Sequence, residues 1–246
     1  MVLTKHSNKD VFANMNNDKF FLIIPASGVG KRMESSTPKQ YLRLENGLTI
    51  IDQCLKTILE INSISGFVVA LSNTDSFFKS SSFFNHSKIL AIAEGGQARF
   101  NSVLNALNSL NKTAQPNDWV LVHDSVRPCI KKSDIEKLIR EVSKDSIGGL
   151  LATSAIDTVK EKDASGSIST IDRKQLYMAQ TPQMFRFGIL KEAIESAIKL
   201  GSKITDESEA IEKLGHSIKI INGSSSNIKI TTKDDIELAN YFLKKL

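Results

Sequence analysis

Cysteine and histidine are scarce in this sequence of 246 residues. Its two cysteines, Cys54 and Cys129, lie far apart and outside any CxxC pattern, which is typical of reduced thiols in a cytosolic protein. We therefore expect a cytoplasmic location and no disulfide bond. The histidines are His6, His86, His123 and His216. Their spacing matches no zinc-binding pattern, which argues against a zinc site.

Long apolar runs and concentrated positive charge are also missing. No apolar run approaches the roughly 20 residues that a membrane-spanning helix requires, so we expect no membrane association. The net charge is +5, but the lysines are scattered and do not form a basic run or alternate with aromatic residues. This distribution disfavours nucleic acid as a partner and suits a basic cleft for small phosphorylated ligands.

The beginning of the chain lacks the apolar core of a signal peptide. Residues 1–19 are polar and rich in asparagine and lysine, and we predict that they form a disordered leader. The content of apolar residues (41%) and of charged residues (24%) is that of an ordinary globular protein. Residues 20–246 are numerous enough to bury a substantial core, and we predict that they form one domain.

Strand-like and helix-like segments alternate along this predicted domain. We predict strands at residues 20–24, 66–72, 88–93, 118–123, 149–156, 217–221 and 227–231. We predict helices at residues 49–61, 99–110, 133–144, 187–200, 206–214 and from about 232 onward. A capping box, Ser133-x-x-Glu136, is expected to open the third helix. This alternation favours an α/β fold with a doubly wound, mostly parallel sheet.

One region interrupts the alternation. Residues 157–162 and 167–172 are short alternating segments joined by the turn-forming sequence Asp-Ala-Ser-Gly, which predicts a β-hairpin. The hairpin has little apolar content, and an isolated two-stranded hairpin is only marginally stable in water. We therefore expect residues 157–182 to form a protruding arm that needs a partner.

The stretch around which the chain is organised is residues 20–44, FFLIIPASGVGKRMESSTPKQYLRL. A buried strand is followed by the small residues 26–30, whose backbone N–H groups can form an anion-binding concavity. The cations Lys31, Arg32 and Lys39 lie just beyond. A strand that ends in a glycine loop followed by cations suits a triphosphate. The plain alternative is a glycine-rich turn with solvated lysines.

Two common glycine-loop motifs are excluded by spacing. A Walker loop needs four residues between its glycines and a Ser or Thr after Gly-Lys, whereas only Val29 separates Gly28 from Gly30. A dinucleotide-binding fingerprint needs a third small residue at the position of Met33.

Two further polar loops leave predicted strand ends, at residues 95–102 and 123–128. In an open α/β sheet, ligands bind beyond the carboxyl ends of the strands. In the first loop, Gln97 and Ser102 can hydrogen-bond the edge of a flat ligand. In the second, Asp124 is a natural partner for Mg²⁺, and Arg127 can pair with it or hold a nearby loop. The alternatives are a tight turn for the first loop and a capping role for Asp124.

The motifs of these loops resemble a known family. PASGVGKRM with PKQYL, EGGQARFNSV and VHDSVRPC, followed in order by DTVK, DRKQLYMAQTPQMF, ITDESEA and NIKIT, resemble motifs of the sugar-nucleotide pyrophosphorylase superfamily. The form PKQYL is similar to its methylerythritol phosphate cytidylyltransferase branch. The resemblance covers nearly the whole chain from Phe20 onward. It implies a Rossmann-like nucleotidyltransferase fold and in-line attack of 2-C-methyl-D-erythritol 4-phosphate on the α-phosphorus of CTP, releasing pyrophosphate, in isoprenoid biosynthesis.

The resemblance also implies roles for individual residues. The implied catalytic residues are Arg32, Lys39 and Lys229, with Arg32 and Lys39 on the α-phosphate. The implied substrate-binding residues are Ala26, Ser27, Gly28, Gly96, Gln97, Ser102, Asp124, Thr158, Arg173, Thr181 and Thr205. Cytosine would lie against the glycine loop and the 95–102 loop, and the divalent cation Mg²⁺ would bridge the phosphates near Asp124.

The second substrate would contact Thr158, Arg173, Thr181 and Thr205. In the family resembled, the arms of two subunits embrace in a homodimer, which would carry Arg173 into the partner's cleft. A guanidinium suits a bidentate grip on a phosphate. The alternatives are that Thr158 and Thr205 are strand and cap residues and that Lys229 is a solvated strand lysine. Arg173 could instead serve its own chain or merely pair with groups near Asp172.

Three positions depart from the usual family pattern. Ser27 replaces alanine, Gln97 stands where some members carry an acid, and Ser125-Val126 replaces Ala-Ala. None of them removes a charge that the chemistry needs. A ribitol or other polyol phosphate cytidylyltransferase is the nearest competing interpretation, although the segment TDESEAIE is more similar to the methylerythritol branch. A non-catalytic nucleotide-binding regulator would lack one of the charged residues Arg32, Lys39 and Asp124, which are all present.

Overall fold

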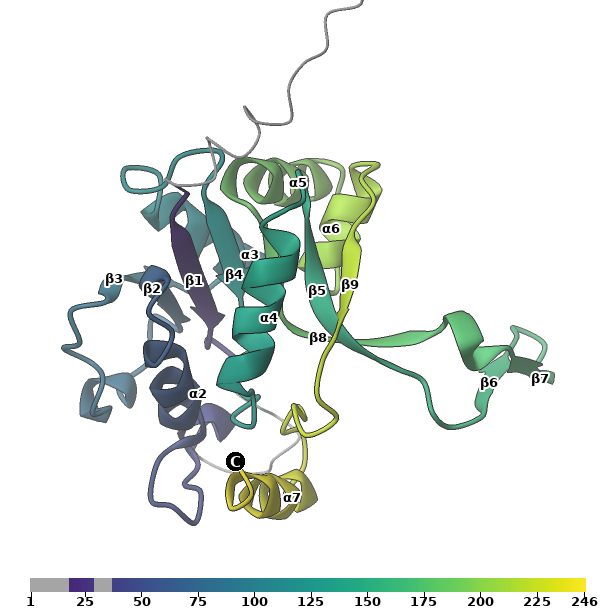
Figure 1. Ribbon diagram of the computed structural model, residues 1–246, viewed down its shortest axis with the longest axis horizontal. Helices are drawn as coiled ribbons and strands as arrows, with labels where there is room; N and C mark the ends of the chain where they lie inside the picture. Colours follow the sequence, from purple (N-terminus) through teal and green to yellow (C-terminus); the bar gives the residue numbers. More distant parts are fainter. Residues whose placement is uncertain (1–17, 29–36) are drawn as a thin grey trace, which may run out of the picture.

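The computed structural model describes residues 18–28 and 37–246 (Figure 1). Most of the predicted leader lies outside these residues. Asp18 and Lys19, however, contact the body: the Asp18 carboxylate lies 2.6 Å from the Arg186 guanidinium, and the Lys19 N–H donates to Asp118 at 2.9 Å. The last two residues of the predicted leader therefore contact the domain.

The strands of the central sheet are β1 (Phe20–Pro25), β2 (Ile64–Leu71), β3 (Ile89–Glu94), β4 (Trp119–Val122), β5 (Gly148–Ser154), β8 (Tyr177–Arg186) and β9 (Lys219–Asn222). Within the described residues these strands form a seven-stranded sheet in the order β3-β2-β1-β4-β8-β5-β9. Strands β1 to β4 pair in parallel, β5 pairs in parallel with β9, and β8 is antiparallel to both β4 and β5. The prediction of an α/β fold with a mostly parallel sheet is confirmed.

Helices cover both faces of this sheet (Figure 1). They are α2 (Ile50–Leu59), α3 (Arg99–Ser109), α4 (Lys132–Val142), α5 (Phe187–Lys199), α6 (Glu207–Lys213) and α7 (Asp234–Leu243), with the short 3-10 helices η3 (Lys39–Tyr41), η4 (Phe78–Ser80) and η5 (Arg173–Gln175). Because side chains alternate along a strand, Leu22 and Ile24 of β1 pack with α2 and α4, whereas Phe21 and Ile23 pack with α3, α5 and α6. The apolar run of β1 is thus buried on both sides.

Strand β8 is the element that the sequence did not predict. It lies inside the sheet, between β4 and β5, although its sequence YMAQTPQMFR is largely polar and contains a proline. Proline cannot donate to a β-ladder, so it is tolerated at irregularities. The pairing of β5 with β8 shifts between Leu150 and Ala152, opposite the segment that contains Pro182. The proline therefore lies at an interruption of the ladder.

Two local predictions are wrong. Residues 227–231 form no strand: Ile230 is buried beside α7 and donates its N–H to the Val126 carbonyl, so its apolar side chain packs a loop. No capping box opens α4, because this helix begins at Lys132 and Ser133 lies inside it. Glu136 instead pairs with Lys132, one turn earlier, at 3.8 Å.

The predicted hairpin is confirmed. Residues 177–182, predicted to be part of the arm, lie instead in β8 and pair with β5, so the name arm is used from here on for residues 155–176, between these two strands. Strands β6 (Val159–Lys162) and β7 (Ile168–Ile171) pair with each other in a separate two-stranded sheet. Asp163 closes the turn by accepting hydrogen bonds from the N–H groups of Ser165 and Ser167. The arm projects away from the body in Figure 1. Across residues 18–28 and 37–246, we find no helix with the length and apolar character needed to cross a bilayer.

Candidate active site

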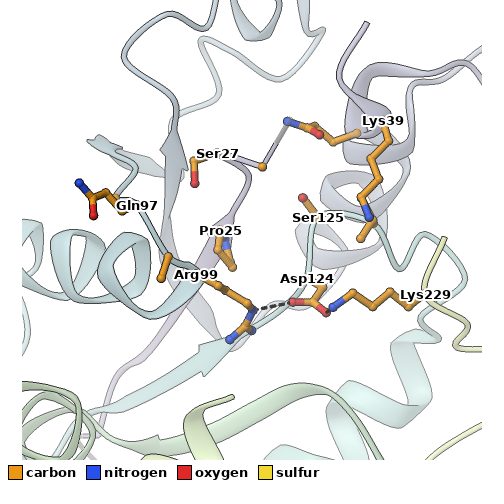
Figure 2. A pocket seen from close by; sticks show the side chains of 13 residues that line it. Pro25, Ser27, Lys39, Gln97, Arg99, Asp124, Ser125 and Lys229 are labelled. Atoms are coloured by element: carbon orange, nitrogen blue, oxygen red, sulfur yellow. Dashed lines mark hydrogen bonds and ion pairs between the residues drawn. The ribbon is translucent and has the colours of Figure 1, made fainter. Parts of the chain in front are cut away.

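A cavity of about 320 Å³ opens where β1, β3 and β4 end (Figure 2). Its lining residues are Pro25, Ser27, Gly28, Lys39, Gln40, Gly96, Gln97, Ala98, Arg99, Asp124, Ser125, Val126 and Lys229. Seven of the predicted site residues are among them: Ser27, Gly28, Lys39, Gly96, Gln97, Asp124 and Lys229. The strands of a doubly wound sheet bring these distant segments to one edge. We call this cavity the cleft.

One wall of the cleft is formed by closely packed backbone. A side chain at Gly95 would place its Cβ 2.2 Å from the Ser27 Cβ, and one at Gly96 would place it 2.2 Å from the Asn101 Cβ. The buried hydroxyl of Ser102 accepts from the Gly96 N–H at 3.0 Å and lies 2.9 Å from the Ser27 hydroxyl. Ser102 therefore holds the wall from behind and does not line the cleft.

Lys39 and its neighbour Gln40 belong to the opposite wall. The Lys39 ammonium donates to the Ile230 carbonyl at 3.2 Å. The buried carboxamide of Gln40 donates to the Ala26 carbonyl at 2.7 Å, which ties η3 to the end of β1. Ala26 is buried and contributes its backbone to the site. Arg32, predicted to act beside Lys39, lies outside the described residues.

Asp124 is a carboxylate of the cleft that three cationic side chains surround. Its Oδ1 lies 2.9 Å from Arg99 Nε, and its Oδ2 lies 2.9 Å from Lys229 Nζ (Figure 2). The same Oδ2 lies 3.5 Å from Arg127 Nε. Burial opposes ionisation of Asp124, but Arg99, and after it Lys229 and Arg127, overcome this effect. They hold the pKa of Asp124 well below its usual range, so that it is an anion at neutral pH. The expected pairing of Arg127 with Asp124 is confirmed.

A second carboxylate lies behind Arg99. Glu207, the first residue of α6, is 1% exposed, and its two oxygens lie 2.6 and 3.0 Å from Arg99 Nη1 and Nη2. Burial raises the pKa of Glu207, an effect that Arg99 opposes. Burial alone lowers the pKa of the Arg99 guanidinium, but Glu207 and Asp124 raise it above its ordinary value. Arg99 is therefore firmly protonated.

Neither Arg99 nor Glu207 was predicted as a site residue. Both lie inside motifs, EGGQARFNSV and ITDESEA, that carried the family resemblance. The motifs therefore marked the segments, but nothing in the sequence indicates that this glutamate is buried against this arginine.

Thr181 of β8 holds the backbone of Asp124 by a hydrogen bond. Its hydroxyl accepts from the Asp124 N–H at 3.0 Å and lies 3.1 Å from Nδ1 of the buried His123. Nε2 of His123 lies 3.3 Å from the Arg127 carbonyl, which can only accept, so we assign the proton to Nε2. Burial lowers the pKa of His123 to about 4. Thr181 thus contacts Asp124 from beneath the cleft, and its predicted contact with substrate stays a prediction.

The remaining predicted residues do not line the cleft. Thr158 and Arg173 lie in the exposed arm, where the Arg173 guanidinium donates to the Ile156 carbonyl. Thr205 is exposed just before α6 and donates its N–H and hydroxyl to Glu209, at 2.7 and 2.8 Å. Their role in binding a second substrate stays a prediction.

The donor set for a metal ion is small. Among residues 18–28 and 37–246, no cluster of three or more His, Cys, Asp and Glu side chains has the arrangement of a metal site. Asp124 is the acidic residue of the described lining, and both of its oxygens already contact cationic side chains. A divalent cation here would have to take its other ligands from substrate phosphates and water.

Comparisons with known proteins agree on one family. Residues 20–245 match the family described as 2-C-methyl-D-erythritol 4-phosphate cytidylyltransferase. A protein of that name from Ruthia magnifica subsp. Calyptogena magnifica is 51% identical over 92% of this chain and 97% of its own length. One from Vibrio vulnificus is 41% identical over 91% of this chain and 94% of its own. The crystal structure of the Francisella tularensis 2-C-methyl-D-erythritol 4-phosphate cytidylyltransferase superposes with a TM-score of 0.79, at 38% identity, over 92% of this chain and 100% of that chain.

Proposed function

The chain belongs to the 2-C-methyl-D-erythritol 4-phosphate cytidylyltransferase family and is therefore a nucleotidyltransferase, and we propose that the cleft around Asp124 is its active site. The reaction of the family joins CTP and 2-C-methyl-D-erythritol 4-phosphate to give 4-diphosphocytidyl-2-C-methyl-D-erythritol and pyrophosphate, in isoprenoid biosynthesis. This assignment sets aside the polyol phosphate cytidylyltransferase and the non-catalytic regulator.

The observation that supports this site best is the meeting of Lys39 and Lys229 in one cleft, opposite the backbone of Gly96. A phosphate oxygen of one substrate must attack the α-phosphorus of CTP, so two anions have to approach each other. Cations fixed in advance lower this repulsion and stabilise the charge of the transition state. We assign this role to Lys39 and Lys229, and to Arg32 by its place in the family motif.

The cytosine ring is proposed to lie along the backbone wall, beside Ser27, Gly96 and Gln97. The side chain of Gln97 is exposed and borders the cleft, so its amide oxygen can accept from the cytosine amino group. Gly28 leaves open space where a side chain would otherwise project, which suits close approach of a phosphate.

Mg²⁺ is proposed to bind with Asp124 as its protein ligand, directly or through water. One carboxylate fits this ion, because Mg²⁺ sites in nucleotide enzymes commonly combine one or two carboxylates with substrate phosphates. Lys229 already lies 2.9 Å from Asp124 Oδ2, so the lysine and the ion compete for that oxygen. When bound, the ion neutralises charge on the triphosphate, while the chain's own residues position the two substrates.

The second substrate is proposed to bind where Thr158, Arg173, Thr181 and Thr205 converge across a homodimer. The arm supports this proposal, since it exposes Ile156 and Ile168 at its surface and its strands β6 and β7, among the described residues, pair only with each other. We further propose a cytoplasmic enzyme without membrane or nucleic-acid partners, in keeping with its two buried, unbonded cysteines and its scattered lysines.

A pyrophosphate-release assay tests the proposed function. The purified protein is supplied with each nucleoside triphosphate, together with 2-C-methyl-D-erythritol 4-phosphate or ribitol phosphate. We expect turnover with CTP and the methylerythritol substrate. Turnover with UTP should be at least about tenfold lower, because the bound base would cover the Gln97 side chain and uracil would leave an acceptor unpaired there, at a cost of about 1–3 kcal/mol. Equal use of UTP, or a preference for ribitol phosphate, would contradict the assignment.

A further inference from the structure

Glu207 is a buried charged residue that the proposed chemistry does not use. It lies at the start of α6 and its side chain is 1% exposed. Burying a carboxylate is costly unless a cation and hydrogen bonds compensate it. The compensation comes from one side chain, because both carboxylate oxygens contact the guanidinium of Arg99, at 2.6 and 3.0 Å.

Arg99 connects Glu207 to the cleft. It is the first residue of α3, and its Nε donates to Asp124 Oδ1 at 2.9 Å while both Nη atoms face Glu207. A guanidinium is a rigid, planar fork, so fixing its Nη edge also fixes the direction of Nε. The bidentate contact with Glu207 therefore determines where Arg99 holds Asp124.

The position of Arg99 alone would suggest a phosphate-binding residue, since it is a cation that lines the cleft. Its contacts argue otherwise, because carboxylates occupy both its Nε and its Nη atoms. Without Glu207, the Nη edge would be free to turn toward a triphosphate or to pair with both oxygens of Asp124. Either change would move Asp124 and alter its contact with Lys229, which lies 2.9 Å from Oδ2.

We propose that Glu207 is a positioning residue for cytidylyl transfer, which acts through Arg99 to hold the Asp124 carboxylate, and with it Lys229, in the cleft. The inference rests on the proposed function of this cleft. It assigns α6 a task in the reaction that is separate from substrate contact at the preceding Thr205. It also accounts for a buried carboxylate that is not among the lining residues of the cleft.

A double-mutant cycle tests the proposal. Glu207→Gln keeps the size of the side chain, but it removes the charge and turns an amide N–H₂ group toward Arg99. We expect kcat to fall about 10- to 100-fold, while KM for CTP changes less than about threefold, because the loss comes from misplacement of Asp124 and Lys229. In an Arg99→Lys background, which lacks the fork, Glu207→Gln should lower kcat by less than about threefold more.

Two results would overturn the proposal. One is a folded Glu207→Gln protein with wild-type kcat, which would leave Glu207 a purely structural role. The other is a pair of losses that simply multiply in the double variant, which would mean that Glu207 does not act through Arg99. Thermal unfolding of every variant accompanies the kinetics, since a structural role lowers the melting temperature without changing the turnover of the folded fraction.

If Glu207→Gln does not fold, Glu207→Asp in the same two backgrounds answers the question, because it keeps the charge but shortens the reach. Its loss should again be large with Arg99 and small with Arg99→Lys, and equal losses would refute the coupling. Glu212→Gln is the matched control, an exposed glutamate of the same helix, and should leave kcat unchanged. Wild-type turnover is measured first, so an inactive wild type refutes the proposed function and not the role of Glu207.

Discussion

Lys39 shows how a single flexible side chain is given a defined place. It begins η3, and the next residue, Gln40, fastens that helix to the Ala26 carbonyl at the end of β1. A lysine has high side-chain entropy, so a fixed base and a contact with the Ile230 carbonyl reduce the cost of holding its ammonium in the cleft.

We expect Lys39→Ala to lower kcat by about 10²–10³-fold, the scale observed when one charge contact to a transition state is removed. The melting temperature should change little, because half-exposed lysines contribute little to stability. Steady-state kinetics and thermal unfolding measure the two effects. The control is Lys79→Ala, an exposed lysine outside the cleft, which should behave as wild type. A raised KM with normal kcat would show that Lys39 binds ground state and transition state equally.

His123 links the stability of the fold to pH. Its pKa in the folded protein is lowered to about 4 by burial, whereas the ordinary value is near 6.5. Below pH 6.5 the unfolded chain therefore takes up a proton that the folded protein refuses. The stabilisation from a neutral His123 is fully present above pH 6.5 and is lost as the pH falls toward 4.

We expect the free energy of unfolding to decrease by up to about 3 kcal/mol between pH 6.5 and 4 on account of His123. Denaturant titrations at pH 7.5, 6 and 5 measure the slope, at values above the range in which Asp124 takes up a proton on unfolding. His123→Gln keeps a donor for the Arg127 carbonyl and should flatten the slope. An unchanged slope in this variant would mean that other groups cause the acid sensitivity.

Among the elements, those with strong apolar periodicity were predictable and those shaped by tertiary context were not. The run of Phe20 to Ile24 and the apolar face of α3 can be read directly, because their spacing matches a buried strand and a helix. Strand β8 was missed, since Pro182 and several polar residues conceal a strand whose neighbours lie far away in the sequence. The isoleucines at 228 and 230 mimic a strand but pack a loop.

In the candidate site, too, contacts set by the order of strands were predictable from the sequence, and contacts set by tertiary packing were not. Ser27, Gln97 and Asp124 could be placed together from the sequence, because parallel strands deliver the loops that follow them to one edge. The contact between Arg99 and Glu207 could not, because α6 reaches the cleft only through the packing of elements that follow β8. Burial of a carboxylate depends on such packing and has no local signature.

The arm makes a prediction at the level of a single element. Ile156 and Ile168 are 77% and 69% exposed, and a partner's arm would cover them. If the proposed dimer forms through the arm, Ile156→Ser with Ile168→Ser should shift the protein from dimer toward monomer in sedimentation velocity, because burying an isoleucine contributes about 1.5–3 kcal/mol. Leu200, at the C-terminal end of α5, is also 76% exposed, so Leu200→Ser is the matched control and should leave the proposed dimer intact. A double variant that sediments as wild type would rule out contact through these side chains.

At the scale of the whole molecule, the proposed dimer predicts a shared active site. If Arg173 reaches the partner's cleft, then inactive Lys39→Ala and Arg173→Ala proteins, mixed under mild dissociation, form heterodimers with one intact site. Statistical exchange makes half of the dimers heterodimers, and one of the two sites in each heterodimer is intact. Activity should therefore return toward roughly a quarter of wild type.

Subunit exchange must be demonstrated independently, for example by recovery of two differently tagged chains in one dimer. Absence of activity despite proven exchange would place Lys39 and Arg173 in the same subunit's site. Lys39→Ala mixed with a second sample of Lys39→Ala is the control, and it should stay inactive at every mixing ratio.

The place of β8 between β4 and β5 also governs the order in which the molecule can assemble. The ribosome completes β1 to β4 early, and these strands pair among themselves. In the part of the chain that the structure describes, strand β5 pairs with β8 and β9 alone, and both are made after the arm. The strands β1 to β4 therefore join β5 and β9 only when β8 inserts between β4 and β5. This step is slow, because it depends on contacts between residues that are far apart in the sequence. In the nascent chain, the edges of β4 and β5 that pair with β8 stay unpaired until the arm and β8 have been synthesised.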